Sequence, residues 1–416
     1  MTSRRSVMQG LTGLGVVAAL GEAGFGDDAL AAAAAARPAA EPGLSEAAAS
    51  GAEWIQVPGK VALIKRTYRP PNYETPLEYF RTPITPNKAF FVRYHHARLP
   101  SIRPRDWSLR IAGPAAERSV SLNLAQLRKD FASHELTALC LCAGNRRGLF
   151  SAHVIGVQWG SGAMGNAHWR GVRLHDVLDR AGVHSDAIEV AFAGDDEPML
   201  PESPDYQKSL PISKALHPDT MIAYEMNGEA LPALHGSPAR LIVPGWTATY
   251  WIKHLSSIEI RTTPFENFWI KTGYRVPAGK FPWMERFATQ ETTATTPITQ
   301  IAVNSLITSP AQNAQFPRTR PVTLTGQCWD SGSGIERLEI SFNEGGHWEA
   351  ARLGADLGGY SLRPWSYTVA PGRPAGPLSV WVRATSRAGL TQPLEATPNP
   401  SGYHHNAIQK LNLVLA

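Results

Sequence analysis

The pattern of apolar residues changes near Thr296, and this change constrains the fold more than any other feature of the chain. Beyond it, apolar and polar residues alternate in short runs between turns rich in Gly, Ser and Asp, as in "RPVTLTGQCWDSGSG" and "PLSVWVRATSRAG". Such alternation places every second side chain on one face of a strand. Short strands separated by turns at this spacing predict a β-sandwich.

Three strand faces of this region can be read directly from the alternation. Cys328 is in phase with Val322 and Leu324, so we interpret it as a core residue rather than a functional thiol. The other residues expected on core faces are Leu338, Ile340, Phe342, Leu378, Val380 and Val382.

The region from about Tyr73 to Pro282 mixes strand and helix patterns, and a length of 416 residues allows two or three domains. "SLRIAG" and "ARLIVPG" predict strands, whereas "SLNLAQLRKDF" predicts a helix beginning at Ser121. "RLHDVLDRAG" predicts a second helix, ended by Gly182. We therefore expect an α+β chain with a mixed α/β domain over residues 71–292, an extended lead-in over 37–70 and the sandwich over 293–416.

The N-terminus has the composition of a targeting segment. "SRRSVMQGLTGLGVVAAL" pairs Arg4 with Arg5 before a short apolar run, and an Ala-rich stretch follows. This pattern predicts a twin-arginine signal over residues 1–36, cleaved near Ala36, and export of a folded protein to the periplasm. A disordered tail and an uncleaved anchor are the alternatives. No later apolar run is long enough to span a membrane. The net charge is +5, and the sequence has no blocks of Lys and Arg of the kind typical of nucleic-acid binding.

The stretch "LCLCAGNRRG" has the most distinctive chemistry in the chain. Cys140 and Cys142 stand at the end of an expected buried strand, and a Gly-Asn turn with Arg146 and Arg147 follows. Thiolates select soft metals, and nearby cations favour the thiolate. The spacing lacks a second Cys or His pair for zinc and lacks a haem attachment motif. The residues alone leave open whether either cysteine is a ligand or both are core.

This stretch belongs to a set of motifs that resembles the sulfite oxidase family of molybdenum enzymes. The others are "FFVRYHHARLP", "VQWGSGAMGNAHWRGVRLHDVL", "AYEMNGEALPALHGSPARLIVPGW" and "YWIKHL", and they occur in the family's order. The resemblance runs from about Thr82 to the C-terminus. It implies that the terminal sandwich is an immunoglobulin-like dimerisation domain and that the chain is a homodimer.

The resemblance implies a molybdenum–molybdopterin cofactor, with Cys142 as the protein ligand of the metal because it directly precedes Ala-Gly-Asn. It places the pterin against a set of aromatic, basic and polar residues. These residues are Phe91, Arg93, His95, Asp196, His235, Arg240, Trp251, Ile252 and Lys253. Such side chains suit a phosphate-bearing ligand, since Arg provides a planar donor fork and Lys a point charge.

The resemblance also implies a substrate pocket made by Arg93, Arg147, Trp159 and Tyr274, in which the two arginines bind an oxyanion. Arg146 is expected to pair with a carboxylate outside the site, and the alternative role for Trp159 is packing. Many members have a further pocket arginine near the C-terminus, but here that region reads "NPSGYHHNAIQ". His404 or His405 could replace that charge only in part, and the alternative for this pair is a solvated loop near the dimer contact.

The expected activity is therefore oxidation of sulfite to sulfate, with electrons passed to a separate c-type cytochrome. One alternative is a sulfane dehydrogenase of thiosulfate oxidation. Another is a molybdenum sulfoxide reductase, although that group lacks the terminal sandwich. An alternative of a different class is a non-catalytic β-sandwich binding protein, which would hold no metal.

Overall fold

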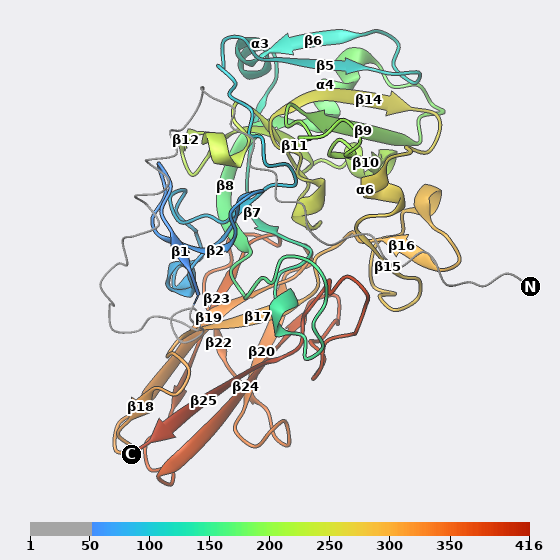
Figure 1. Ribbon diagram of the computed structural model, residues 1–416. Coiled ribbons are helices and arrows are strands. Elements are labelled where there is room, and N and C mark those ends of the chain that lie inside the picture. The colour runs from blue at the N-terminus through green and yellow to red at the C-terminus, as the bar shows by residue number, and fades with distance from the viewer. Residues whose placement is uncertain (1–51) are drawn as a thin grey trace, which may run out of the picture. The chain divides into compact units, whose positions relative to one another are not determined.

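The computed structural model describes residues 52–416, so the expected signal segment lies outside the described residues. This part of the chain is mostly β, with few helices (Figure 1). The expectation of a mixed α/β first domain therefore overstates the helical content. In residues 52–416 no helix has both the length and the apolar character needed to cross a membrane.

The first sheet is built from the beginning of the described chain. Its order is β1-β2-β3-β4, with β1 at Trp54–Ile55, β2 at Leu63–Thr67, β3 at Asn72–Glu74 and β4 at Val92–Arg93. The expected extended lead-in thus supplies two strands of a sheet. Because β4 ends at Arg93 opposite Asn72, this sheet delivers the segment 91–95 to the middle of the molecule.

A second sheet carries the cysteine-rich stretch. Its order is β12-β11-β8-β7, and β13 also pairs with β11. The strands are β7 at Ser133–Leu141, β8 at Met164–Arg173, β11 at Met221–Met226, β12 at Glu229–Ala230 and β13 at Arg240–Ile242. Cys140 and Cys142 face the main core, whereas Leu139 and Leu141 pack with Trp329 of the sandwich. The alternation of one strand thus separates the cysteines from the domain contact.

A third sheet, order β10-β9-β14-β5-β6, covers the other side of the main core. Its strands are β5 at Ser108–Ala112, β6 at Val120–Asn123, β9 at Glu189–Gly194, β10 at Gln207–Pro211 and β14 at Leu255–Arg261. All its pairings are antiparallel except that of β5 with β14. The small sheet of β15, Arg275–Pro277, and β16, Thr295–Pro297, precedes the sandwich.

The helices are short. They are α3 at Leu124–Lys129, α4 at Leu174–Ala181, α5 at Ile212–Ala215 and α6 at Phe268–Lys271, with 3₁₀ turns η1 at Leu77–Phe80, η2 at Arg147–Leu149, η3 at Ala233–His235, η4 at Ala248–Tyr250 and η5 at Ala288–Gln290. The expected helix start at Ser121 is wrong, because Ser121 lies in β6 and Asn123 caps α3 with its side chain. The prediction for α4 is confirmed, including its end at Gly182.

The C-terminal region consists of two sheets around one apolar core. One has the order β17-β19-β23-β22 and the other β18-β25-β24-β20-β21. The strands are β17 at Asn304–Ser309, β18 at Gln315–Phe316, β19 at Val322–Trp329, β20 at Ile335–Ser341, β21 at Glu349–Ala350, β22 at Arg352–Leu353, β23 at Arg363–Val369, β24 at Gly376–Ser386 and β25 at Gln409–Leu415. Leu338, Val380 and Cys328 are fully buried there, so the prediction that Cys328 is a core residue is confirmed.

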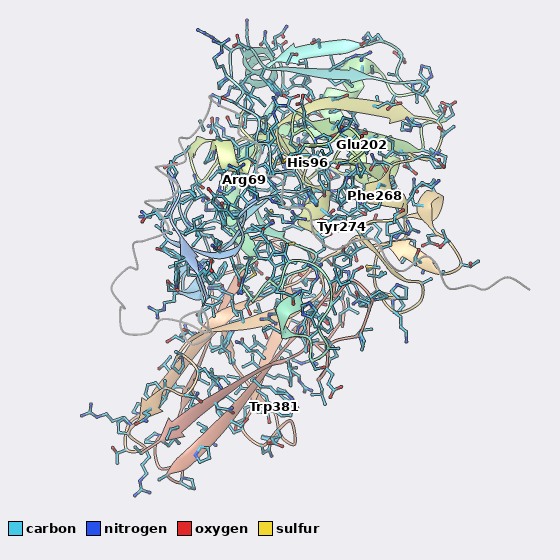
Figure 2. All side chains as sticks on the ribbon, viewed as in Figure 1. Arg69, His96, Glu202, Phe268, Tyr274 and Trp381 are labelled. Carbon is cyan, nitrogen blue, oxygen red and sulfur yellow. The ribbon has the colours of Figure 1, made fainter. Side chains whose placement is uncertain are left out.

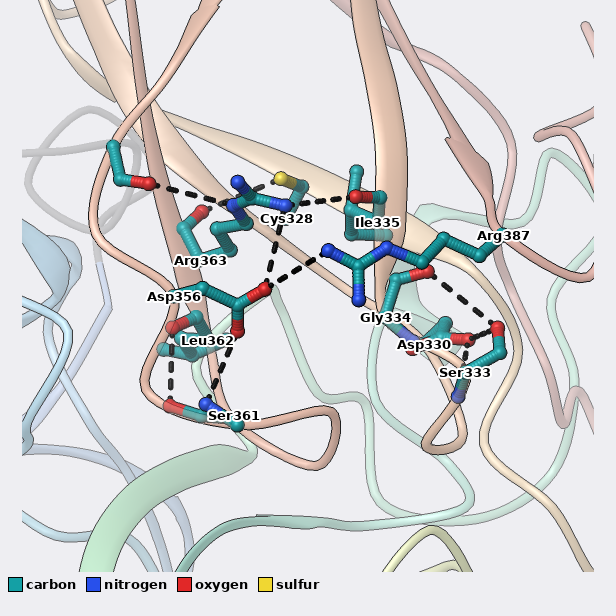
Figure 3. A network of polar contacts seen from close by, with 12 residues as sticks. Cys328, Asp330, Ser333, Gly334, Ile335, Asp356, Ser361, Leu362, Arg363 and Arg387 are labelled. Carbon is teal, nitrogen blue, oxygen red and sulfur yellow. Dashed lines mark hydrogen bonds and ion pairs between the residues drawn. The ribbon is translucent and has the colours of Figure 1, made fainter.

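Two loops of the sandwich are held by polar contacts around Asp330 and Asp356 (Figure 3). The Asp330 carboxylate accepts hydrogen bonds from the backbone N–H groups of Ser333 and Gly334, and Asp356 pairs with Arg363 and Arg387. The second of these loops leads to Tyr360, whose carbonyl accepts a hydrogen bond from Leu139 N at 2.9 Å. The sandwich therefore supports β7 just before the two cysteines.

Candidate active site

One cavity brings most of the predicted site residues together. Its volume is about 670 Å³, including the part open to solvent. The predicted residues that line it are Phe91, Arg93, His95, Cys142, Asp196, His235, Arg240, Trp251, Lys253 and Tyr274. Ile252, Arg147 and Trp159 lie outside this lining. Figure 2 shows Tyr274 and His96 among the strands of the larger region, whereas Trp381 lies in the sandwich.

The turn after β7 presents Cys142 to the cavity. Cys142 N donates to Ala163 O at 2.9 Å, and Asn145 Oδ1 accepts from Ala163 N at 3.0 Å, so the turn is fastened to the segment before β8. The buried Glu74 carboxylate of β3 accepts from Gly160 N and Gly162 N and holds that segment in turn. The Cys142 thiol is therefore carried on a backbone that is hydrogen-bonded on two sides.

The two cysteines of the turn differ in surroundings. Both line the cavity and both are free. The Cys140 thiol lies 3.9 Å from an Arg240 nitrogen and is 2% exposed, whereas Cys142 is 8% exposed. Burial raises the pKa of Cys140 to about 11, so it stays a thiol at neutral pH. The greater exposure of Cys142, together with the Arg240 contact of Cys140, favours Cys142 as the metal ligand.

In residues 52–416 no group of three His, Cys, Asp or Glu side chains could hold a metal ion. A metal bound at Cys142 therefore needs further ligands from another molecule, and soft sulfur donors would match the thiolate.

Part of the cavity wall carries positive charge. Arg240 donates to His235 O at 3.0 Å and to Trp251 O at 3.3 Å, while its buried Nε has no hydrogen-bond partner within the described residues. Lys253 Nζ donates to Arg93 O at 2.7 Å. Burial and the neighbouring guanidinium groups of Arg240 and Arg93 lower the pKa of Lys253 well below its usual value. Placing several cationic side chains side by side away from water is unfavourable, and an anionic ligand would offset that unfavourable free energy.

Asp196 is the carboxylate of the cavity lining. Burial raises its pKa, and Lys253 and His96 act in the opposite direction. Burial and the nearby cations Arg93 and Lys253 lower the pKa of His95 well below its usual value, so His95 is neutral at neutral pH. The lining therefore contains the guanidinium groups of Arg93 and Arg240 against a single carboxylate, so its charge balance is positive even without the Lys253 amine.

Tyr274 stands at the junction of the cavity and the predicted substrate pocket. Its φ of +58° is unusual for a bulky residue, and such strain gathers at functional sites. The Tyr274 hydroxyl hydrogen-bonds to His95 Nε2 and accepts from an Arg93 nitrogen at 3.5 Å. On its other side, the ring stacks on Tyr403 at a centroid distance of 5.6 Å. Tyr274 is thus held in one orientation by three partners.

Arg147 reaches the same place from outside the cavity lining. Its guanidinium lies 5.3 Å from the centre of the Tyr403 ring, and its Nε donates to Ser401 O at 2.8 Å. A Cβ at Gly144 would lie 2.6 Å from an Arg147 nitrogen, so the turn after Cys142 needs this glycine to make room for the guanidinium. Arg147 and Tyr274 therefore meet at the ring of Tyr403.

Arg146 points away from the site, as predicted, but the partners of its terminal nitrogens are an amide and a backbone carbonyl and not the expected carboxylate. Its two terminal nitrogens donate to Asn304 Oδ1 and Ser305 O, each at 2.7 Å. These contacts lie at the start of β17, so Arg146 joins the cysteine turn to the sandwich. Trp159 is 1% exposed and belongs to the main core, which agrees with the packing alternative.

The two histidines near the C-terminus do not supply a charge to the pocket. His404 is buried against Phe281 and Trp283, and burial lowers its pKa to about 3. His405 packs on Phe150, and burial together with Arg146 lowers its pKa to about 4. Neither histidine therefore replaces an arginine charge, since both are neutral at neutral pH, and the alternative of a solvated loop is wrong because His404 is buried.

Several residues of the site were missed in the sequence. Tyr403 stands in "SGYHH" beside the histidines that drew attention, and Tyr206 lies flat on His95 at a ring distance of 3.6 Å. The other missed lining residues are Phe90, Tyr94, Leu234, Ala248 and Thr249. An aromatic residue carries no signal of its own in one sequence, because it is more often core.

Comparisons with known proteins identify the family of the chain. Residues 96–269 match the family described as "Oxidoreductase molybdopterin binding domain", and residues 295–414 match "Mo-co oxidoreductase dimerisation domain". The chain is 33% identical over 383 residues to "Sulfite oxidase, mitochondrial" of Drosophila melanogaster, covering 87% of this chain and 65% of that protein. It is 34% identical to "Sulfite oxidase" of Gallus gallus, covering 79% and 72%.

The fold is also similar to that of a solved structure. The sulfane dehydrogenase SoxCD from Paracoccus pantotrophus matches with a TM-score of 0.70 at 24% identity, over 94% of this chain and 97% of that one. At this identity the likeness concerns the fold alone.

Proposed function

Since the chain belongs to the sulfite oxidase family, we propose that it oxidises sulfite to sulfate at the cavity described above. One observation carries the proposal: a single cavity joins the thiol of Cys142 to a cationic wall and to Tyr274. The cofactor is molybdenum–molybdopterin. When bound, it accepts two electrons and provides the oxygen that sulfite gains, so that sulfite and water become sulfate, two protons and two electrons.

The residues present fit this cofactor. Arg240 keeps a buried Nε without a partner, and Arg93 and Lys253 add positive charge, as an anionic phosphate-bearing ligand requires. His235 and Trp251 provide a polar and an aromatic contact on the same wall. Cys142 would provide the protein's sulfur ligand. The remaining ligands would come from the cofactor, consistent with the lack of a His/Cys/Asp/Glu cluster in the described residues.

Arg93 and Arg147 would bind the doubly charged substrate from two directions. Each guanidinium can donate two parallel hydrogen bonds to an oxyanion. Tyr274 would donate a hydrogen bond from its hydroxyl group to an oxygen of the substrate or product. Its partner His95 is neutral and can either donate or accept a hydrogen bond, so this exchange needs no change of charge. The Tyr403 ring between Arg147 and Tyr274 would exclude water from this side.

The finer parts of the proposal concern partners and location. We propose that the sandwich is immunoglobulin-like and mediates a homodimer, which is supported by the dimerisation family matched by residues 295–414. A c-type cytochrome would accept the electrons one at a time. The signal pattern of residues 1–36 supports export to the periplasm by the twin-arginine route. Sedimentation of the full chain as a monomer would contradict the homodimer.

The deciding experiment assays the exported protein with sulfite and cytochrome c, beside thiosulfate and a sulfoxide, and measures molybdenum per chain. We expect about one molybdenum per chain and turnover with sulfite. Turnover with thiosulfate or with a protein-bound sulfane sulfur, but not with sulfite, would favour a sulfane dehydrogenase. Metal-free protein without turnover would favour a binding protein.

A further inference from the structure

A buried lysine from the first sheet reaches the back of the cavity wall. Lys60 follows a tight turn at Gly59 (φ +76°), where its N–H donates to Val57 O at 3.0 Å. The residue is only 8% exposed. Burial lowers the pKa of Lys60 to about 7, which reflects the cost of placing this amine in the interior. A lysine kept at that cost needs a reason beyond packing.

The contacts of Lys60 use its whole hydrogen-bonding capacity. Its Nζ donates to Asn87 O at 2.7 Å and to Phe90 O at 2.9 Å, and its third contact is the Nε2 atom of His235. An ammonium group has three donors and no acceptor. With two donors on carbonyl oxygens, the charged amine directs its third donor at His235 Nε2, and an anionic ligand bound in the cavity favours this charged form.

This contact determines where the His235 ring carries its proton. A nitrogen that accepts a hydrogen bond is unprotonated, so the neutral ring holds its proton on Nδ1. Burial and the cations Lys60 and Arg240 lower the pKa of His235 well below its usual value, in agreement with a neutral ring. The ring lines the cavity.

The ring is also fixed in its plane. Phe90 contacts it edge-on at a centroid distance of 5.1 Å and an interplanar angle of 70°. The Phe90 carbonyl is one of the two acceptors of Lys60, so the same short segment holds both partners.

We propose that Lys60 is a positioning residue for the cofactor: it holds His235 in the tautomer whose Nδ1–H donates to an acceptor atom of the molybdopterin. Without Lys60, the ring is free to exchange tautomers and to turn, and the donor is lost for part of the time. The inference rests on the proposed position of the cofactor in this cavity. The tautomer is inferred from the contact of the charged Lys60 amine with Nε2, and it is a property of the protein that can be tested apart from turnover.

The first test is ¹⁵N NMR of histidine-labelled holoenzyme, with the His235 signals identified by their loss in His235→Gln. We expect the pattern of a neutral ring with Nδ1 protonated and Nε2 unprotonated. A ring protonated on Nε2, or on both nitrogens, would overturn the proposal. The NMR measurement does not depend on turnover, so it still reports the tautomer of His235 if the enzyme does not oxidise sulfite.

The second test compares Lys60→Met with Lys65→Met. Lys65 lies in β2 of the same sheet but pairs with Glu53 and is 32% exposed at its side chain. We expect Lys60→Met to lose the cofactor about tenfold faster than wild type, as seen when the outer partner of a ligand is removed, while Lys65→Met behaves as wild type. The readout is pterin fluorescence and molybdenum content over time. Unchanged retention in Lys60→Met would contradict the inference.

A double variant separates positioning from a structural role. If Lys60 acts through His235, then Lys60→Met combined with His235→Gln loses the cofactor no faster than His235→Gln alone. Additive losses would show that Lys60 acts by another route and would overturn the proposal. Lys60→Gln, which keeps an N–H donor for the carbonyls, replaces Lys60→Met in both comparisons if the latter does not fold.

Discussion

The interior around the cavity and the interior of the sandwich bury different side chains. Before residue 296 the buried cationic residues are Lys60, Arg146, Arg147, Lys208, Lys214, Arg240 and Arg275. After it, no Lys or Arg is buried in the described chain. Both interiors are closely packed, but the sandwich buries apolar residues that need no partner, whereas the first region buries cations that are costly without one.

The comparison teaches that buried charge has two uses here. Arg275 donates to the carbonyls of Ile270 and Gln290, so its contacts are internal and structural. Arg240 lies at the cavity and keeps an Nε without a partner in residues 52–416. The first kind of charge is satisfied by the fold, and the second is left for a ligand. Substitutions in the two regions should therefore separate activity from stability.

The largest expected effect is on turnover when the proposed metal ligand is changed. Cys142→Ser should lower turnover more than about 100-fold, because the metal loses its protein sulfur. Cys140→Ser and Cys328→Ser should keep most of it, since neither thiol is assigned to the metal. Turnover with sulfite and molybdenum content of all three variants give the answer. Equal activity in Cys142→Ser and Cys140→Ser would reject the assignment.

A smaller effect on turnover is expected when the neighbouring residues Arg146 and Arg147 are substituted one at a time. Arg147→Gln should raise the Michaelis constant for sulfite by about 10–100-fold, the value of one charge-assisted hydrogen bond, with little change in melting temperature. Arg146→Gln should lower the melting temperature and leave the Michaelis constant close to that of wild type, because Arg146 contacts the sandwich. Steady-state kinetics and thermal melts of both variants test the difference. Loss of molybdenum from Arg147→Gln would assign Arg147 to the cofactor.

A third and smaller effect on turnover is expected when the Tyr403 ring, which stacks on Tyr274, is removed. Tyr403→Ala should lower kcat/KM by about 3–10-fold, since an aromatic pair contributes about 0.5–1.5 kcal/mol and Tyr274 loses its stacking partner. Tyr403→Phe, which keeps the ring, should stay close to wild type. If Tyr403→Phe lowers kcat/KM by more than about 10-fold, the hydroxyl group and not the ring contacts the substrate.

The smallest effect on turnover is expected in the sandwich. Leu338→Ala should lower the free energy of unfolding by about 2–5 kcal/mol, because it leaves a cavity in a fully buried position. The turnover of each folded molecule should not change. Denaturant unfolding and kinetics on the same sample test this, and a loss of turnover without a loss of stability would contradict the separation of the two interiors.

The sequence predicted those parts of the molecule that local pattern controls. The alternation of Leu338 and Ile340 and the phase of Cys328 predicted buried strand faces, and the 3.6-residue spacing of Leu174, Val177 and Leu178 predicted α4. The helix start at Ser121 failed because β6 continues to Asn123 by pairing with β5, which the local pattern cannot reveal.

The sequence by itself determined the motifs, and through them the family and the set of polar residues near the cofactor. Only the tertiary structure decided which neighbours act together: Arg147 turns to Tyr403 while Arg146 turns to the sandwich, and Lys60 meets His235 across 175 positions of chain. The reason is physical. A periodic pattern reports which face of an element is buried, but burial, charge and hydrogen bonding between distant segments arise only when the sheets pack.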